Sequence, residues 1–301
     1  MKILLLGAQG QLGTRLRQAL PGIAEVVALG RSGDSGLCGD LTQLAALRDT
    51  VRRLAPDVIV NAAAYTAVDL AESQAELAFA VNAAGPAALA EEAQACGAWL
   101  VHYSTDYVFD GSGSRPWQET DVPAPLNNYG RSKLAGEEAI RAACARHFIL
   151  RTSWVFDALG ANFLRTILQR AASQDTLSVV DDEIGAPTPA AWLADLTLQL
   201  IRQRSDSNAG TYHAAAAGET SWNGYARFAL ACAREQGHAL RAGPENVAAI
   251  PAESLHRAAA RPRNSRLSTG KLQRRFGIVP PPWQDGVRAA VQAWVAQAKT
   301  P

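Results

Sequence analysis

The amino-acid sequence predicts an α/β protein with a Rossmann-like, doubly wound parallel sheet and a smaller, interleaved C-terminal substrate-binding domain. In the first half, short apolar runs typical of buried strands alternate with segments of helical spacing. A glycine-rich turn joins the first strand to the first helix. After about residue 155 the alternation loosens and turn-rich segments intervene. We therefore expect a dinucleotide-binding domain over 1–155 and a mainly substrate-binding domain over 156–301, with some later segments returning to the first.

The elements of the first domain follow from the pattern in chain order. The run "KILLLG" is continuously apolar and ends at glycine, which is typical of a strand buried on both faces. The segment after it has helical spacing and stops at Pro21. The expected strands are 2–7, 24–30, 56–64, 98–109 and 147–156. The expected helices are 10–20, 41–54, 71–97 with an interruption at Gly85 and Pro86, and 129–144. Such alternation requires right-handed crossovers and hence a parallel sheet.

Composition excludes several classes of protein. The chain has 301 residues, of which 48% are apolar and 19% charged, and a net charge of +1. It therefore offers no bulk attraction for nucleic acid or a membrane surface. The cysteines have no paired spacing, so neither a disulfide framework nor a zinc site is expected. No apolar run reaches the ~20 residues needed to cross a bilayer, and no signal pattern is present. We expect a cytoplasmic protein.

The stretch "GAQGQLG" places Gly7, Gly10 and Gly13 between a strand and a helix. A sharp turn there lets a pyrophosphate approach the backbone and bind the N–H groups of the helix N-terminus. The spacing is related to the G-x-G-x-x-G fingerprint of dinucleotide-binding proteins. A plain tight turn is the alternative, but the position directly after the first strand favours dinucleotide binding.

The end of the second strand indicates which dinucleotide is bound. An acidic residue there would bind the ribose of NAD, whereas an arginine accommodates the 2′-phosphate of NADP. The strand ends in Gly30, Arg31 and Ser32, so the acid is missing. We expect NADPH, with NADH as an alternative cofactor, although Arg31 could also be a solvated loop charge. Asp40 and Leu41 are placed where they could flank the adenine.

A candidate catalytic group follows the strand expected at 98–109. Ser104 and Thr105 lie near its carboxyl end, where ligands of open parallel sheets bind. Tyr129 and Lys133 come later, four apart, and so share one face of a helix. An ammonium beside a phenol should lower the tyrosine pKa and let it donate a proton to a carbonyl oxygen. An isolated pair of this kind is usually inert; after a dinucleotide loop it indicates catalysis.

Together these motifs resemble the extended short-chain dehydrogenase/reductase family, and the resemblance covers essentially the whole chain. It is similar in particular to members that reduce nucleotide-linked 4-keto sugars. The segments that carry it are "GAQGQLG", "CGDLT", "PDVIVNAAAYTAVDLAE", "VHYSTDYVFDG", "APLNNYGRSKLAGE", "RTSWVF", "IGAPT" and "RPRNSRL". The resemblance implies reduction of the 4-keto group of dTDP-6-deoxy-L-lyxo-4-hexulose, a dTDP-sugar, with NAD(P)H.

The resemblance also implies roles for individual residues. Tyr129 would donate the proton, Lys133 would bind the nicotinamide ribose, and Thr105 would bind the keto oxygen. The residues implied for cofactor binding are Gly7, Gly10, Gln11, Leu12, Gly13, Arg31, Asp40, Leu41, Ala63, Ala64, Tyr65, Thr66, Tyr103, Tyr129 and Lys133. Those implied for substrate binding are Thr105, Asp106, Trp154, Arg261 and Asn264.

Two positions depart from the pattern of this family. Some members dimerise around Mg²⁺ held by glutamates, and the matching positions here are Arg15 and Ala191. An arginine repels a cation, so we expect no bound metal and either a monomer or a metal-independent homodimer.

Three other functions use related sequences. A sugar-nucleotide dehydratase would need a second carboxylate where Tyr107 follows Asp106. An epimerase would need the ribose-binding acid that is missing. A non-catalytic regulatory subunit of methionine adenosyltransferase would not need Thr105, Tyr129 and Lys133, which are all present.

Overall fold

The computed structural model describes residues 1–298, so the last three residues of the 156–301 region lie outside the described part. A six-stranded sheet forms one lobe, in the order β10-β5-β4-β3-β1-β2. Every neighbouring pair in it is parallel. Its strands are β1 (Lys2–Leu6), β2 (Glu25–Leu29), β3 (Val58–Asn61), β4 (Trp99–Thr105), β5 (His147–Thr152) and β10 (Gly210–His213). The predicted fold class is confirmed.

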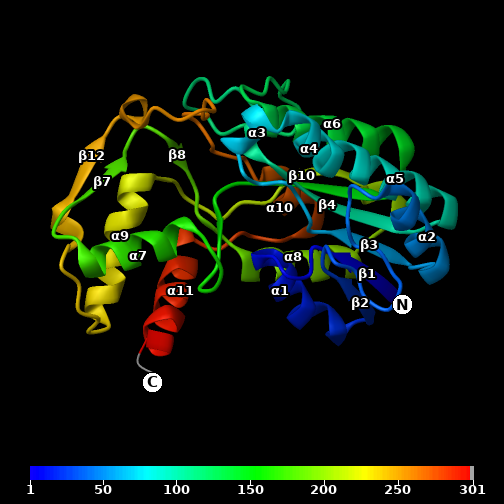
Figure 1. Ribbon diagram of the computed structural model, residues 1–301, viewed down its shortest axis with the longest axis horizontal. Helices are drawn as coiled ribbons and strands as arrows, with labels where there is room; N and C mark the ends of the chain where they lie inside the picture. Colours follow the sequence, from blue (N-terminus) through cyan, green and yellow to red (C-terminus); the bar gives the residue numbers. More distant parts are fainter. Residues whose placement is uncertain (299–301) are drawn as a thin grey trace.

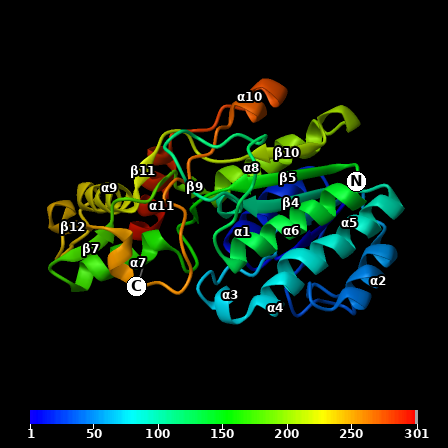
Figure 2. The ribbon, with the colours of Figure 1, turned by 90° about the horizontal axis from the view of Figure 1, so that it is seen from above.

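Helices cover both faces of this sheet, which explains why its strands are apolar throughout. Ile3 and Leu5 of β1 belong to the core on one face, and Leu4 and Leu6 to the core on the other. The first face carries α1 (Gln11–Ala19), α8 (Ala190–Arg202) and α10 (Gly270–Phe276). The second carries α2 (Leu44–Leu54), α5 (Gly85–Cys96) and α6 (Asn128–Ala143), which lie side by side in Figure 2.

A second lobe lies beside the sheet, at the left of Figure 1. Its core is formed by α7 (Phe163–Ser173), α9 (Trp222–Glu235) and α11 (Trp283–Ala298) together with β7 (Leu177–Val180) and β12 (Val247–Ile250), which pair in parallel. The short strands are β6 (Val155–Phe156), β8 (Ile184–Gly185), β9 (Thr188–Pro189) and β11 (Thr220–Ser221). The 3₁₀ helices are η1 (Leu20–Gly22), η3 (Asp106–Val108), η4 (Asp206–Asn208), η5 (Pro244–Asn246) and η6 (Ala252–Leu255). None of the described helices is long and apolar enough to cross a membrane.

The chain passes between the lobes more than once. After β9 it returns to the sheet lobe, where α8 packs against α1 and β10 extends the sheet beside β5. It then crosses again, and α10 comes back to the same face as α8. Segments beyond residue 156 therefore complete the sheet lobe.

Two predicted elements are interrupted in the structure. The long helix expected over 71–97 consists of α3 (Leu70–Ser73), α4 (Ala75–Phe79), the π-helical turn η2 (Ala80–Ala84) and α5. The π-helical turn lies directly before Gly85 and Pro86, the residues at which an interruption was expected. The strand expected over 147–156 breaks at Trp154, whose φ of +49° is left-handed and ends the extended backbone.

Candidate active site

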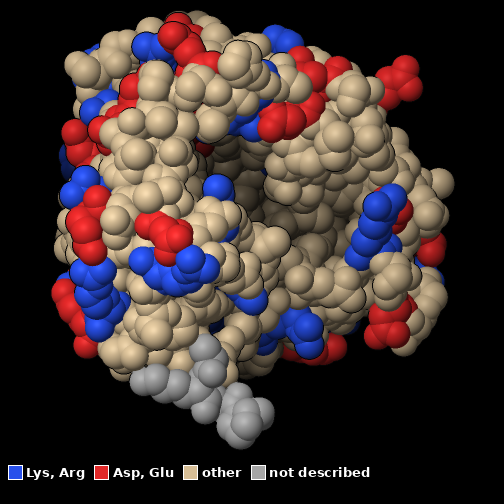
Figure 3. Space-filling view, turned by 60° about the vertical axis from the view of Figure 1, so that its left-hand side comes forward, with Lys and Arg blue, Asp and Glu red and all other residues tan. Residues whose placement is uncertain are grey.

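Two adjoining cavities open at the carboxyl ends of β1, β3 and β4, where parallel sheets bind ligands. The first, which we call the loop cavity, has a volume of about 340 Å³ and is lined by the loops after β1, β2 and β3. The second, the central cavity, has a volume of about 650 Å³ and contains Tyr129 and Lys133. Both are lined by Gln9 and Gly10, so they form one continuous groove. Figure 3 shows the deep hollow in the surface of the molecule.

The glycine-rich loop brings the start of α1 close to the end of β1. Gly7 has a φ of +76°, a left-handed value that glycine adopts without strain. At Gly13, a Cβ atom would lie 2.0 Å from the carbonyl oxygen of Gly7, so only glycine allows this approach. No side chain caps the first turn of α1 and no acid lies in it. Its N–H groups, including those of Gln11 and Leu12, therefore suit an anion.

The loop cavity contains the residues predicted to select the dinucleotide. Gly30, Arg31, Asp40 and Leu41 all line it. The Arg31 side chain is 80% exposed, and its Nε atom lies 3.3 Å from a carboxylate oxygen of Asp40. Thr42 donates two hydrogen bonds to the other oxygen of Asp40, at 2.9 and 2.8 Å. Burial raises the pKa of Asp40, but the hydrogen bonds from Thr42 and Arg31 outweigh it, so the net pKa is lowered.

The loop after β3 contains Ala63, Ala64, Tyr65 and Thr66, which line one or both cavities. Asn82 in η2 ties this loop to the helix α6. Its Oδ1 accepts the Tyr65 N–H at 2.8 Å, and its Nδ2 donates to the Tyr65 carbonyl and to Ser132 Oγ, both at 3.0 Å. Sequence reasoning missed Asn82. The helix interruption beside it was the available signal, since π-helical turns are frequent at functional sites.

Tyr129, Lys133 and Thr105 line the central cavity together. Asn127 caps α6, because its Oδ1 accepts the Gly130 N–H at 2.8 Å. This cap fixes the start of the helix, which places Tyr129 in the first turn and Lys133 one turn later. Thr105 is the last residue of β4, so the strand end and the helix start meet at the cavity.

Burial raises the pKa of Tyr129 to about 12, although a hydrogen bond with Thr105 opposes the shift. The expected lowering of this pKa by Lys133 is not found with the lysine Nζ in its present position. Lys133 Nζ donates to the Tyr103 carbonyl at 2.6 Å and lies 3.1 Å from His102 Nε2. Burial lowers the pKa of Lys133 itself to about 8. Tyr129 is consequently protonated at neutral pH, as a proton donor must be.

A buried ion pair lies beneath the catalytic helix. Arg151 of β5 donates to both carboxylate oxygens of Glu137, at 2.9 and 2.6 Å, and both side chains are buried. Arg141 adds a third bond to Glu137 at 3.0 Å. Glu137 follows Lys133 by one helical turn, so the pair anchors α6 to the sheet. This role is not evident from sequence, because the partners are on different elements.

Asp106 and Trp154 also line the central cavity. Burial raises the pKa of Asp106 to about 7, and its Oδ2 has no hydrogen-bond partner among the described residues. The ring of Trp154 stacks on that of Trp222 with centroids 3.7 Å apart. Trp222 lines the cavity as well, although the sequence motifs do not single it out.

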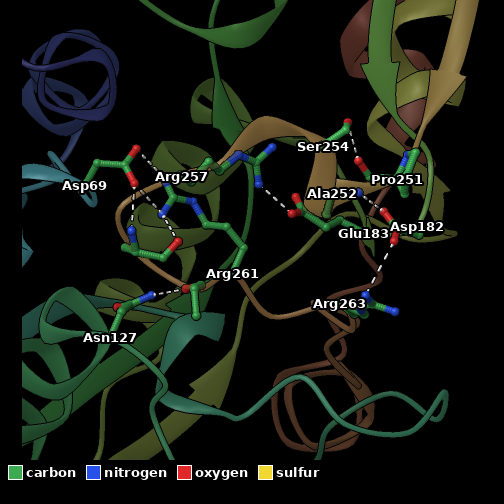
Figure 4. Close-up of polar contacts among 12 residues, drawn as sticks. Asp69, Asn127, Asp182, Glu183, Pro251, Ala252, Ser254, Arg257, Arg261 and Arg263 are labelled. Carbon is green, nitrogen blue, oxygen red and sulfur yellow. Dashed lines mark hydrogen bonds and ion pairs between the residues drawn. The ribbon is translucent and has the colours of Figure 1, made fainter.

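A third cavity of about 330 Å³, the arginine cavity, shares Tyr107 and Trp222 with the central cavity. Phe163, Arg170, Arg257 and Arg261 also line it. Figure 4 shows Arg261 paired with Asp69 and Arg257 paired with Glu183, with closest distances of 2.7 and 2.5 Å. The predicted contact residue Arg261 thus lies next to the catalytic group.

Asn264, implied for substrate binding, lines neither the central cavity nor the arginine cavity. Its side chain is buried, and its amide group donates to the carbonyls of Ser112 and Arg115 at 3.2 and 2.8 Å. The carbonyl oxygen of the same amide accepts from Arg266. Asn264 has no free donor for a phosphate and instead holds the loop together.

Arg15, at one of the two positions where the resemblance implies a metal ligand in some family members, is paired with Asp157. Its Nε and Nη2 atoms lie 2.5 and 2.6 Å from the two carboxylate oxygens. Ala191, at the other position, offers no ligand. Within residues 1–298 no group of three or more His, Cys, Asp or Glu residues could hold a metal ion.

Three features lie together at one edge of the parallel sheet: a phosphate-binding loop, a tyrosine–lysine pair on one helix, and a threonine at the adjoining strand end. They define a nicotinamide-dependent oxidoreductase of the short-chain dehydrogenase type. The comparisons with known proteins agree with this class. The chain belongs to the family described as the RmlD substrate binding domain, whose model matches residues 1–295.

Individual relatives match along nearly their whole length. The chain is 47% identical to dTDP-4-dehydrorhamnose reductase of Salmonella typhimurium, with 96% of each chain covered. Among solved structures, dTDP-4-dehydrorhamnose reductase of Clostridium acetobutylicum matches with a TM-score of 0.89 and 34% identity, over 97% of this chain and 99% of that one. The enzyme of the same name from Bacillus anthracis, in complex with NADP, matches with a TM-score of 0.88 and 33% identity over the same shares.

Proposed function

We propose that the protein is an NADPH-dependent reductase that converts dTDP-4-dehydro-L-rhamnose to dTDP-L-rhamnose by reducing the 4-keto group. The names of its relatives and the NADP bound by one of them support this activity. The observation that carries the proposal is that Tyr129, Lys133 and Thr105 line one cavity that continues into the dinucleotide groove.

The reaction needs one hydride and one proton, and the nicotinamide supplies the hydride when bound. Thr105 holds the keto oxygen by a hydrogen bond. Tyr129 donates its phenolic proton to that oxygen, and its pKa of about 12 keeps the proton available at neutral pH. Protonated Lys133 stabilises the phenolate that remains and binds the nicotinamide ribose.

The continuous groove fits an extended dinucleotide. Gly10, Gln11 and Leu12 would hold the pyrophosphate, and Asp40 and Leu41 would lie by the adenine. The other residues that would contact the cofactor are Gly7, Gly13, Arg31, Ala63, Ala64, Tyr65, Thr66 and Tyr103. Arg31 would bind the 2′-phosphate of NADPH, because its guanidinium is exposed beside the loop cavity. NADH is the weaker cofactor, since it lacks that phosphate.

The dTDP-sugar occupies the central and arginine cavities. Asp106 and Trp154 contact the hexose, because both line the cavity of Tyr129. The shared residues Tyr107 and Trp222 mark the passage to the arginine cavity, where Arg257 and Arg261 contact the diphosphate.

Three further proposals accompany this function. Residues 1–155 bind the dinucleotide, and 156–301 mainly bind the sugar nucleotide. The enzyme acts in the cytoplasm without a nucleic-acid or membrane partner. It is a monomer or a metal-independent homodimer, since the Arg15–Asp157 pair stands where relatives are expected to hold a metal.

A turnover assay tests the proposal. Purified protein is mixed with NADPH or NADH and a panel of dTDP- and UDP-linked 4-keto-6-deoxyhexoses, and the decrease of NADPH absorbance and the sugar product are followed. We expect oxidation of NADPH only when the dTDP-linked keto sugar is present. Interconversion of the sugar without net cofactor consumption would indicate an epimerase. An absence of turnover with every sugar would leave the regulatory-subunit alternative.

A further inference from the structure

Lys133 is connected to a buried chain of polar side chains that the proposed mechanism does not use. His102 in β4 is fully buried, and its Nε2 atom lies 3.1 Å from Lys133 Nζ. Its Nδ1 atom lies 3.1 Å from Nδ2 of Asn61, which is also buried, at the end of β3. The three side chains therefore form a line from one strand, through the next, to the catalytic helix.

The direction of each hydrogen bond follows from the Asn61 end. The Ala63 N–H donates to Asn61 Oδ1 at 3.1 Å, so the NH₂ group of Asn61 is the one that faces His102. An amide NH₂ can only donate, so His102 Nδ1 must accept. A neutral imidazole with an accepting Nδ1 carries its proton on Nε2. That N–H points at Lys133.

Two donors cannot bond to each other, so this arrangement discriminates between the two forms of Lys133. A neutral amine accepts the Nε2–H and still donates to the Tyr103 carbonyl, 2.6 Å away. An ammonium has no lone pair and would meet the Nε2–H as a second donor. Moving the ring proton to Nδ1 would only shift the same conflict to Asn61.

We propose that His102 is a positioning residue that favours the neutral amine of Lys133 over the ammonium and releases its Nζ towards Tyr129 when the lysine takes up a proton. This inference rests on the proposed function only where it concerns turnover. Because Lys133 supports the Tyr129 phenolate as an ammonium, His102 then limits the alkaline end of the active pH range.

The other charged and titratable groups near Lys133 do not replace His102 in this role. Glu137, one turn along α6, favours the ammonium but is itself neutralised by Arg151 of β5 and by Arg141. Tyr129 is protonated, and the charge of Asp106, which follows β4, raises the pKa of Tyr129. Burial holds the pKa of His102 well below its usual range, with the Lys133 charge acting in the same direction, so its ring is neutral.

The tautomer of His102 is the direct test, and it needs neither cofactor nor substrate. Nitrogen-15 histidine spectra of the cofactor-free wild-type protein, with the His102 ring signals assigned by through-bond correlation to its backbone, should show a neutral ring protonated on Nε2 between pH 6 and 9. A ring protonated on Nδ1 would overturn the proposal, whatever the enzyme turns over.

The pH profile of kcat/KM is the second test. For the wild type we expect an alkaline decline centred near the Lys133 pKa of about 8. In His102→Gln the amide oxygen can accept from the ammonium, so the decline should move to higher pH by about one pH unit, a tenfold change in the lysine's proton affinity. His147→Gln is the matched control, since His147 is buried and bonds the Cys144 carbonyl instead. A His102→Gln profile that is lower at every pH but not displaced would show a merely structural role; should this variant not fold, the tautomer decides.

Discussion

Replacing Arg31 by alanine should remove most of the preference for NADPH over NADH. The Arg31 guanidinium is 80% exposed, and its Nε atom lies 3.3 Å from Asp40, a long contact. Asp40 keeps its two hydrogen bonds from Thr42 in the variant, so the loop should stay in place. The substitution therefore removes a charge from the loop cavity with little change to its shape.

The magnitude follows from the exposure of that charge. A hydrogen bond to a charged group contributes roughly 1.5–3 kcal/mol, or about 10- to 150-fold in affinity. Solvent and salt screen an exposed pair, so we expect the lower end, about tenfold, near physiological ionic strength. NADH has no 2′-phosphate, so its kcat/KM should change by less than about twofold.

Initial rates with both cofactors, at low and high salt, measure this difference. The loss for NADPH should shrink as salt is added, because screening already weakens the wild-type contact. Arg17→Ala removes an exposed arginine of α1 and should change neither cofactor's kcat/KM. If kcat/KM is equal for both cofactors in the wild type and unchanged in Arg31→Ala, Arg31 points into solvent and does not contact the cofactor. Gly30→Asp should shift preference towards NADH, provided that the Gln9 side chain, 2.7 Å from the new Cβ, moves aside.

Other substitutions test the rest of the site. Tyr129→Phe should keep the fold and cofactor binding but lose on the order of 10²–10⁴-fold in kcat, the usual contribution of general acid catalysis; a near-normal rate would make Tyr129 structural. Glu137→Gln leaves the buried Arg151 charge without its partner and should lower the free energy of unfolding by roughly 3–5 kcal/mol in urea titrations. The exposed acid Glu245, paired with Arg234, is the control, where the same change should leave the midpoint of the urea titration nearly unchanged. Activity and sedimentation should be insensitive to EDTA, because Arg15 places its own positive charge at the position in question; a dimer that dissociates on chelation would contradict this.

Local patterns predicted the elements whose sequence signal is local. Strands such as β1 read as continuous apolar runs because both of their faces are buried, and the Tyr129–Lys133 spacing needs only one helix. The strand β10 escaped prediction, since "GTYH" is four residues long and carries no period that distinguishes it from a loop. Its place in the sheet is decided by pairing with β5, a tertiary contact.

The misjudged site residues have the same cause. Lys133 was expected to act on Tyr129, but its orientation depends on His102 and the Tyr103 carbonyl of a neighbouring strand. His102 lies inside an apolar run, where a single polar residue gives no hint of its partner. The resemblance implies substrate binding by Asn264, whereas backbone carbonyls of another loop bind its amide.

The late arrival of β10 has a consequence for how the chain folds during synthesis. The sheet edge at β5 has no neighbour until residues 210–213 have left the ribosome, because only β10 pairs there among the described strands. Until then the nascent chain presents an unpaired parallel edge, which is a template for association with other chains. The helix α8 is made just before β10 and packs on α1, so it covers the neighbouring apolar face before the edge is closed. Folding of the sheet lobe therefore has to wait for most of the polypeptide, and slow elongation between β5 and β10 would prolong the period in which aggregation competes.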